Sequence, residues 1–551
     1  MFARRMAVLF TVLGWLLAFF EVTLPLGLGI RFHLAEAAGL AAAYFAGGPL
    51  GGALVGLIVG SSTFGTLWLP NAVGHAAALG LAGWAFARWG RKARVIFLSQ
   101  GVLAVTVAGA LALNEWDGAV FAGTALTLVI ALLPGALIMA IPFKLTWWWT
   151  SLVVATGIAF TLVARAPLFP EAAAVAPVEG LHAGVAVVDV TPTPGEEVFL
   201  GGYSGRSGPG RGEPLDPITL RVLVLQEGSQ RVTFLAMDTV GMGSNLASRL
   251  RAAAGAGDVF LSSSHSHSAP DLQGLWGGAD PAYEDRLVEA ARSATSEAVK
   301  SMKPAVLNTA TGALPLGIQK NRRGWEMAFD RINTLRITTT DGAPIATLAN
   351  FALHPTVLDR GNARFSADFV GVMRQVAEAK LGGKVLFANG ALGDIVPHAP
   401  DGVEALGRRL GEEVAQVGRL GMAADSPKLT VAHEALDLPL SNWKFQVAWS
   451  VGWLRYQQAW AGVVPVMRTR VSVIHLGDVT LLTAPGEVTT RLARRLEGAD
   501  FLLGLTHDSL GYLIPRDEWQ TGRNENYEES VSLGPQAGER YAAAARRLLS
   551  K

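Results

Sequence analysis

Two histidines that follow a short apolar run are the first residues in this chain that could do chemistry. His265 and His267 stand two positions apart, just after the apolar run that ends at Leu261. Side chains of an extended segment alternate between its two faces, so residues two apart point to the same face. Two imidazoles on one face can bind a metal ion, or they can form a surface or hydrogen-bonding pair. The spacing alone leaves both interpretations open.

Three further residues of metal-binding types lie at the ends of predicted elements. His354 closes an apolar run just before Pro355, which ends a strand. Glu487 falls in the first turn of a predicted helix, where the helix dipole alone already favours a carboxylate. Tyr512 could bind a cation through its phenol oxygen, although packing is the ordinary role of a tyrosine. Taken one at a time, none of the three requires a functional interpretation.

The elements that must position these residues predict an α/β or mixed-sheet domain after about residue 175. Short β-rich runs separated by Gly, Pro and Asp alternate there with helical patterns. A domain of about 370 residues can bury a hydrophobic core large enough to be stable without cross-links or an obligate partner. Ends of strands are where α/β domains assemble their sites. The expected strands are 185–190, 219–226, 231–237, 258–263, 331–340, 345–351, 384–388 and 471–475, and the expected helices are 281–302, 369–381, 402–417 and 486–496.

The first 166 residues differ in composition, because long apolar runs make up most of the chain between residues 6 and 164. Several runs approach the ~20 residues with which a helix spans a bilayer. We therefore expect an all-α polytopic membrane domain over 1–166 with six or seven spans, a linker over 167–180 and a second domain over 181–551. The basic residues near positions 4 and 88–94 favour seven spans and an extracytoplasmic second domain. The expected localisation is that of an integral, multi-pass membrane protein.

Composition excludes several classes of function. The 551 residues carry a formal net charge of +1, with 17% charged residues, 50% hydrophobic residues and no cysteine. The absence of cysteine excludes disulfides, a thiol nucleophile and cysteine-ligated metals. No clustered basic stripe is present to neutralise phosphates, so we expect no nucleic-acid partner. The oligomeric state is left open.

The order of several short motifs between residues 181 and 535 resembles that of the neutral, non-lysosomal ceramidases. Each motif is weak alone, but their joint occurrence in one order is specific. The motifs are GVAVVDVTP at 184–192 with Gly-Gly-Tyr at 201–203, SHSHSAP at 264–270, Asn-Arg at 321–322, His-Pro-Thr at 354–356, Phe-Ser-Ala-Asp at 365–368, PGEVTT at 485–490, and YLIPRDEW at 512–519 with Tyr-Glu at 527–528.

This resemblance implies a zinc-dependent hydrolase in the second domain. Transferred position by position, the zinc ligands of the family correspond to His265, His354, Glu487 and Tyr512. Two imidazoles, a carboxylate and a phenolate can hold Zn²⁺ and leave room for a water whose pKa falls toward ~7. The metal ion expected from the resemblance is therefore Zn²⁺.

The same resemblance assigns roles to His267 and Arg322, and the chemistry of a carboxylate gives one to Asp368. His267 and Arg322 match family positions that contact the substrate or the developing oxyanion. An imidazole or a cation beside the attacked carbonyl stabilises charge that appears only in the transition state. Asp368 is a plausible acceptor that orients a ligand imidazole from behind. These three residues complete the expected catalytic set.

The expected activity is cleavage of the amide bond of an N-acyl, ceramide-like lipid by zinc-activated water, on a chain anchored in the bilayer. One residue departs from the family pattern, because Val396 stands where the family has a serine. Valine offers no hydroxyl for attack or for recognition of a sphingoid hydroxyl. Two alternatives therefore remain, an inactive ceramidase-like binding or sensor domain, and an ester or amide hydrolase acting on a non-sphingoid substrate.

Overall fold

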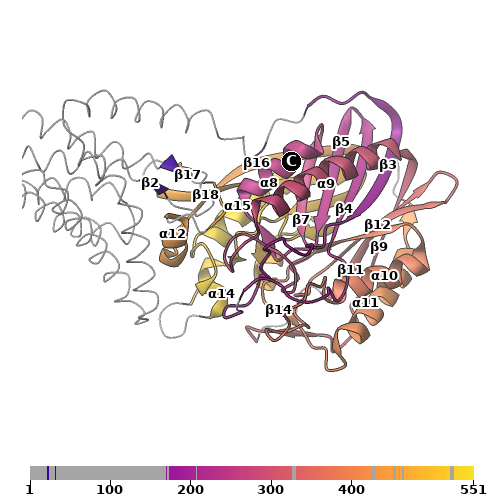
Figure 1. Ribbon diagram of the computed structural model, residues 1–551. Coiled ribbons are helices and arrows are strands. Elements are labelled where there is room, and N and C mark those ends of the chain that lie inside the picture. Colours follow the sequence, from indigo (N-terminus) through magenta and orange to yellow (C-terminus); the bar gives the residue numbers. More distant parts are fainter. Residues whose placement is uncertain are drawn as a thin grey trace, which may run out of the picture. The chain divides into compact units, whose positions relative to one another are not determined.

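The computed structural model describes most of the chain beyond residue 172. The described residues are 173–550, with gaps at 207, 325–329, 424–427, 451–453, 458, 462–463 and 521–525, together with Phe169 and two short strands, β1 (Val22–Thr23) and β2 (Arg31–Phe32). The chain divides into two compact units, and the second comprises Ala166–Phe445, Leu454–Ala461 and Pro465–Lys551 (Figure 1). The predicted domain boundaries at 166 and 181 stay predictions. The fold described below is that of the second unit.

A nine-stranded mixed sheet forms the centre of this unit. Its strands follow the order β13-β12-β11-β9-β3-β4-β5-β7, and β15 pairs with β9. The β5–β7 and β12–β13 pairs are parallel, and the other pairs are antiparallel. The strands are β3 (Val178–Asp189), β4 (Thr219–Gly228), β5 (Gln230–Met237), β7 (Asp258–Ser263), β9 (Lys303–Ala313), β11 (Arg331–Thr339), β12 (Pro344–Phe351), β13 (Lys384–Asn389) and β15 (Met422–Ala423).

Four amphipathic helices pack against one face of this sheet. α8 (Ser244–Ala254) and α9 (Pro281–Lys300) share a core with β3, β4, β5 and β7, while α10 (Phe369–Leu381) and α11 (Gly402–Arg419) share one with β11, β12 and β13. Local sequence sets the helix starts. The Asp280 side chain accepts a hydrogen bond from the Tyr283 N–H and Pro281 opens α9, a typical N-terminal arrangement.

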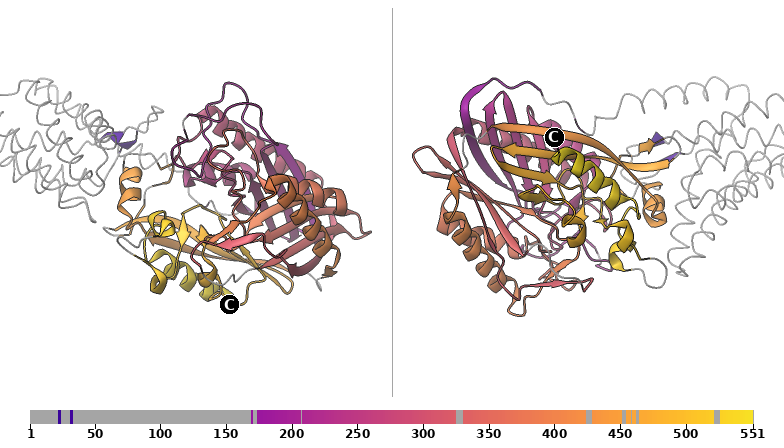
Figure 2. Two further views of the ribbon diagram at one scale, coloured as in Figure 1. Left: turned by 90° about the horizontal axis from the view of Figure 1, so that it is seen from below. Right: turned by 180° about the vertical axis from the view of Figure 1, so that it is seen from behind.

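A second sheet covers the opposite face. Its strand order is β16-β18-β19-β21, with β17 paired to β18, and the buried residues of both sheets form one apolar core between them. Strand β4 is therefore buried on both faces: Leu223 faces the second sheet, and Val222 faces the helices. Figure 2 shows the orange and yellow strands lying across the magenta sheet. The elements are β16 (Leu429–Pro439), β17 (Ala459–Ala461), β18 (Val464–Leu476), β19 (Val479–Thr483), β21 (Phe501–Leu503) and α15 (Ala537–Leu549), which packs on β16.

Three very short strand pairs join loops that are distant in sequence. They are β6 (Gly241–Met242) with β8 (Asp271–Leu272), β10 (Gln319–Asn321) with β14 (Ile395–Pro397), and β20 (Glu487–Val488) with β22 (Tyr512–Leu513). The predicted helix over 486–496 is wrong at its start, since Glu487 lies in β20 and the helix α13 spans only Thr490–Ala493. Short helices α12 (Trp443–Ser450) and α14 (Tyr527–Ser530) complete the loops.

The mixed α/β part of the predicted fold is confirmed. The predicted all-α polytopic membrane domain and the predicted localisation as an integral multi-pass protein are wrong for the part of the chain that the structure describes. Among the described residues, no helix has both the length and the apolar composition to cross a membrane. The longest of them, α9, carries Glu284, Asp285 and Arg286 and buries one face only. Val22–Thr23, inside the first apolar run, which was expected to span the membrane from residue 6 to about residue 30, is a strand paired with β2. The other predicted spans lie outside the described residues.

Candidate metal centre

The candidate site forms where loops after the sheet strands meet. His265 follows β7, and its main-chain N–H donates to Thr239 O in the loop after β5 at 2.9 Å. His265 has a φ of 70°, a left-handed conformation that non-glycine residues rarely adopt. His354 follows β12, and its N–H donates to Ile395 O at 3.2 Å. Both histidines are thus fixed by their own main chain.

The rings of His265 and His354 are oriented by main-chain carbonyls. His265 Nδ1 lies 2.5 Å from Val240 O, and His354 Nδ1 lies 2.8 Å from Ile395 O. A carbonyl oxygen can only accept, so each Nδ1 carries the hydrogen and each Nε2 of the neutral ring keeps a lone pair. This arrangement is typical of metal-binding histidines, whose second nitrogen is held by an acceptor.

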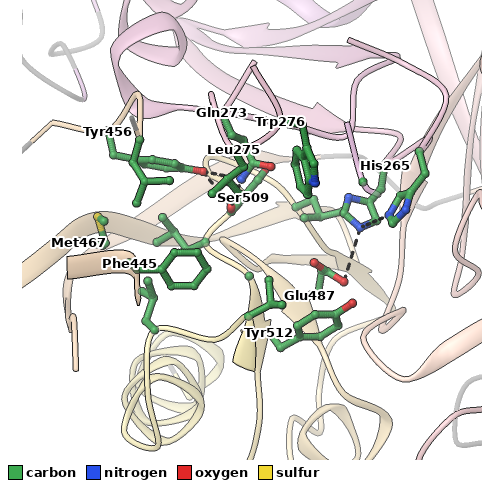
Figure 3. A pocket seen from close by; sticks show the side chains of 18 of the residues that line it. His265, Gln273, Leu275, Trp276, Phe445, Tyr456, Met467, Glu487, Ser509 and Tyr512 are labelled. Carbon is green, nitrogen blue, oxygen red and sulfur yellow. Dashed lines mark hydrogen bonds and ion pairs between the residues drawn. The ribbon is translucent and has the colours of Figure 1, made fainter. Parts of the chain in front are cut away.

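The Nε2 atoms of these rings converge with a carboxylate in a buried centre, of which Figure 3 shows His265 and Glu487. The donor atoms of His265, His267 and His354 lie within 4.8 Å of one another. Glu487 Oε2 lies 3.0 Å from His354 Nε2 and 3.5 Å from His265 Nε2, and His267 Nε2 lies 3.4 Å from His265 Nε2. A carboxylate this close to two Nε2 atoms requires a positive charge among them, which is either a metal ion or a proton on an imidazole; burial lowers the pKa of His265, but Glu487 outweighs burial and raises it. The centre is therefore built around a positive charge.

Glu487 and Tyr512 reach the centre together because β20 and β22 pair in parallel with these two residues opposite each other. Burial raises the pKa of Glu487, but the imidazoles of His265 and His354 outweigh burial and hold it well below its usual range. Tyr512 is buried, and its ring stacks on that of His354 with a centroid distance of 6.5 Å. Burial and then the charge of Glu487 raise the pKa of Tyr512.

His267 is held differently from the other two histidines. Its Nδ1 is buried without a hydrogen-bond partner, and its ring lies at 4.9 Å from the Tyr203 ring, edge to face. Gly202 packs directly under the imidazole, where an added Cβ would lie 2.2 Å from its Cγ. Burial, and then the neighbouring His265 and His354, lower the pKa of His267 well below 6.5, so the ring is neutral.

Arg322 lies beside the centre and is linked to it through Tyr527. Its guanidinium lies 4.9 Å from the Tyr527 ring centroid, and the Tyr527 ring lies 6.0 Å from that of Tyr512. The Arg322 Nε also lies 3.5 Å from Glu528 Oε1. The side chain is partly exposed, so a permanent positive charge stands at the edge of the buried centre.

Asp368 has other partners than a ligand imidazole. Its carboxylate accepts hydrogen bonds from the N–H groups of Leu358 at 2.8 Å and of Phe369 at 2.7 Å, and it caps α10. Burial raises the pKa of Asp368 to about 6. The residue fixes the loop that follows His354, whereas the carbonyls of Val240 and Ile395 orient the imidazoles.

Sequence analysis missed two kinds of supporting groups. The carbonyls of Val240 and Ile395 belong to the main chain and have no side-chain signature. Asp394 accepts hydrogen bonds from Thr490 N at 2.8 Å and Thr490 Oγ1 at 2.7 Å, and from Asn321 Nδ2 at 2.8 Å. It thereby ties the loop of Glu487 to the segment of Arg322. Its place in Gly393-Asp394 is a signal that could have been used, since a carboxylate after glycine in a strand-end loop often bonds to neighbouring main chain.

Comparisons with known proteins give matches at the level of structure. No family profile and no curated protein sequence matches the chain. The neutral ceramidase from Pseudomonas aeruginosa superimposes with a TM-score of 0.54 and 16% identity, over 68% of this chain and 74% of that structure. A structure described as ceramidase complexed with C2 gives a TM-score of 0.55, with the same identity and coverage. The chain has a ceramidase-like fold. This likeness of fold supports the resemblance that was inferred from the sequence motifs.

Proposed function

We propose that this chain is a member of the neutral ceramidase family and a zinc-dependent hydrolase that cleaves the amide bond of an N-acyl lipid. The observation that carries the proposal is the convergence of three imidazoles and the Glu487 carboxylate in a buried centre. The ceramidase-like fold supports it.

The donor set fits a zinc ion. Zn²⁺ is typically bound by imidazole and carboxylate groups, which this centre offers without any thiolate. In the proposed site His265, His354, Glu487 and Tyr512 hold the metal. His265 and His354 are assigned as ligands because an acceptor fixes the second nitrogen of each ring. The pKa of Tyr512 is raised, so its phenol would ionise only beside a cation.

The remaining groups of the centre supply proton transfer and charge stabilisation. Zn²⁺, when bound, supplies a Lewis acid that polarises the amide carbonyl and lowers the pKa of water. His267 is neutral, and its Nε2 faces the centre 3.4 Å from His265 Nε2, so this nitrogen can take a proton from the attacking water and return it to the departing amine. Arg322 brings a fixed positive charge to stabilise the oxygen on which negative charge develops.

Metal content tests this proposal most directly. We expect about one zinc ion per chain in the purified protein, and at least about tenfold less in His265→Ala together with loss of N-acyl amide turnover. The matched control is His475→Ala, because this histidine bonds to Thr480 on strands β18 and β19, outside the centre. A folded wild-type chain that neither contains nor takes up zinc would overturn the proposal.

A second candidate is hydrolysis of an ester or of a non-sphingoid amide. The observation that favours it is Val396 in β14, directly after Ile395, whose carbonyl holds His354. A valine there cannot bind a sphingoid hydroxyl. A panel of N-acyl sphingoid bases, simple N-acyl amides and matched esters separates the two. Exclusive cleavage of esters or simple amides would replace the ceramide-like substrate, and specific binding without turnover would favour an inactive binding domain.

A further inference from the structure

An apolar pocket leads away from the metal centre within the second unit. His265, Glu487 and Tyr512 line one end, and Phe445, Met467 and Tyr456 line the other (Figure 3). Trp276, Leu454 and Leu510 add apolar surface along its walls. We call this pocket the arm. Beyond the metal centre, none of the residues that line the arm is charged, so it suits an apolar group.

The far end of the arm is closed by polar groups that satisfy one another. Gln273 Nε2 donates to Tyr456 Oη at 2.8 Å and to Ser509 O at 2.6 Å, and Tyr456 Oη donates to Ser509 O at 2.8 Å. Both amide hydrogens of Gln273 and the hydroxyl hydrogen of Tyr456 are thus used. The closed end therefore offers a substrate no free donor from these groups, and it holds the Tyr456 ring in place.

The walls of the arm are fixed before any ligand binds. The buried carboxylate of Asp271 accepts hydrogen bonds from the N–H groups of the loop that carries Trp276. These donors are Gln273 at 3.0 Å, Gly274 at 3.0 Å, Trp276 at 2.7 Å and Gly278 at 3.0 Å. Arg455 N donates to Gln273 O at 2.9 Å, which docks the Tyr456 segment onto the same loop.

We propose that the arm binds one unbranched aliphatic chain of the substrate and that Tyr456 sets the longest chain it accepts. The inference rests on the proposed function, which places the scissile bond at the metal centre. A chain too long for the arm must displace a buried, hydrogen-bonded tyrosine or leave methylenes in water. A methylene forced into the filled arm costs roughly tenfold in specificity, whereas a methylene left in water only adds no further binding energy. The chain can come from the acyl half or from the amine half, and both have the same chemistry in the arm.

Two substrate series test the length limit in turnover. In one series the acyl chain is lengthened on a fixed amine, and in the other an alkyl amine is lengthened on a fixed acyl group. We expect kcat/KM in one series to rise with length and then to fall roughly tenfold per added methylene. Tyr456→Ala should move this cut-off to longer chains, whereas the matched control Tyr456→Phe keeps the ring and the cut-off. The series that shifts identifies the half that enters the arm.

Binding measurements separate this inference from the proposed function. Straight-chain carboxylates of increasing length are titrated into the full chain by calorimetry, with wild type, Tyr456→Ala and Met467→Ala compared. Length-limited binding without turnover would leave the inference standing while the hydrolase proposal fails. Turnover with a length profile that is the same in wild type and in the folded variants would overturn the inference alone. Met467→Ala enlarges the arm from β18, so the test does not depend on the folding of Tyr456→Ala.

Discussion

Two histidine clusters in this fold, one buried and one partly exposed, use the same residue types with opposite results. In the metal centre, the imidazoles of His265 and His354 give their Nδ1–H to carbonyls and turn free Nε2 atoms toward Glu487. The second cluster, which we call the bridge, links Asp258, His433, Ser472 and His507. His433 lies between Asp258 Oδ1 and Ser472 Oγ at 2.7 Å each, and His507 Nε2 lies 2.8 Å from the same hydroxyl.

The difference between the two clusters lies in where the lone pairs go. In the bridge the hydroxyl of Ser472 lies between the two imidazoles, and these contacts join β7 to β16 and β18, while His507 Nδ1 stays buried without a hydrogen-bond partner. In the metal centre, three imidazole nitrogens and one carboxylate oxygen instead converge on one place. Residue type alone does not make a metal site, because the decisive property is whether lone pairs remain free and point to one place.

The largest predicted effect compares the carboxylates of the two clusters. Glu487→Gln removes the negative charge among the imidazoles, so we expect zinc affinity and kcat/KM to fall more than about a hundredfold. Asp258→Asn removes the equivalent charge from the bridge and should leave zinc content unchanged. Metal analysis and turnover of both variants check this. Equal zinc loss in the two would erase the distinction between the clusters.

A second prediction sharpens the roles within the metal centre. Gly202 has a φ of 89° and packs under His267, so Gly202→Ala would push the imidazole aside. We expect a loss of kcat of about tenfold to a hundredfold with zinc retained, since a small misplacement of a catalytic group is costly. Zinc content and kcat are measured on the same preparation. Gly180→Ala, at a glycine with a similar φ of 72° and open space for a Cβ, controls for backbone strain.

A third prediction concerns the bridge as a structural element. His507→Ala removes a buried hydrogen bond and packing against Phe260, whose ring centroid is 5.1 Å away. We expect the free energy of unfolding to fall by about 2 kcal/mol, with zinc bound as in wild type. Denaturant unfolding and metal analysis measure the two quantities. Loss of zinc without loss of stability would mean that His507 serves the metal centre instead.

The smallest predicted effect is a pH dependence that originates next to the bridge. Burial raises the pKa of Asp508 to about 6, against the attraction of Arg251 and a hydrogen bond from Thr469. Because the folded state binds this proton more tightly than the unfolded state, its contribution to stability is present below about pH 4 and is lost as pH rises through about 6. Asp508→Asn should therefore reduce the pH dependence of the free energy of unfolding between about pH 4 and pH 6 by on the order of 1 kcal/mol per pH unit. Unfolding at several pH values tests it, and an unchanged slope would contradict it.

Much of the fold follows from local patterns in the sequence. The helices expected at 281–302, 369–381 and 402–417 are present as α9, α10 and α11, since each has an amphipathic period of several turns. The strands β16, β19 and β21 were missed, and Glu487 was placed in a helix. Pairing with distant segments sets these strands, most clearly in the two-residue pair β20–β22, and local sequence contains little of that information.

The candidate site was predictable in its members and less so in its geometry. The order of the motifs selected His265, His354, Glu487 and Tyr512, and the fold brings them together. The joining of His267 to the imidazole cluster, and the carbonyls that hold the other two rings, depend on loop conformations such as the left-handed His265. The membrane prediction rested on the length of the apolar runs and on the positions of the basic residues between them, and neither establishes that a run is helical.

The wide spacing of the metal-centre residues has a consequence for how the protein is made. The side chains come from positions 265, 354, 487 and 512, on loops of both sheets. During synthesis the three imidazoles emerge long before the carboxylate and the phenol, and such distant contacts form slowly. A nascent chain that has reached only the first sheet holds a histidine cluster without its counter-charge. Completion of the centre therefore reports that the second sheet has docked, and metal uptake would serve as a marker of finished folding.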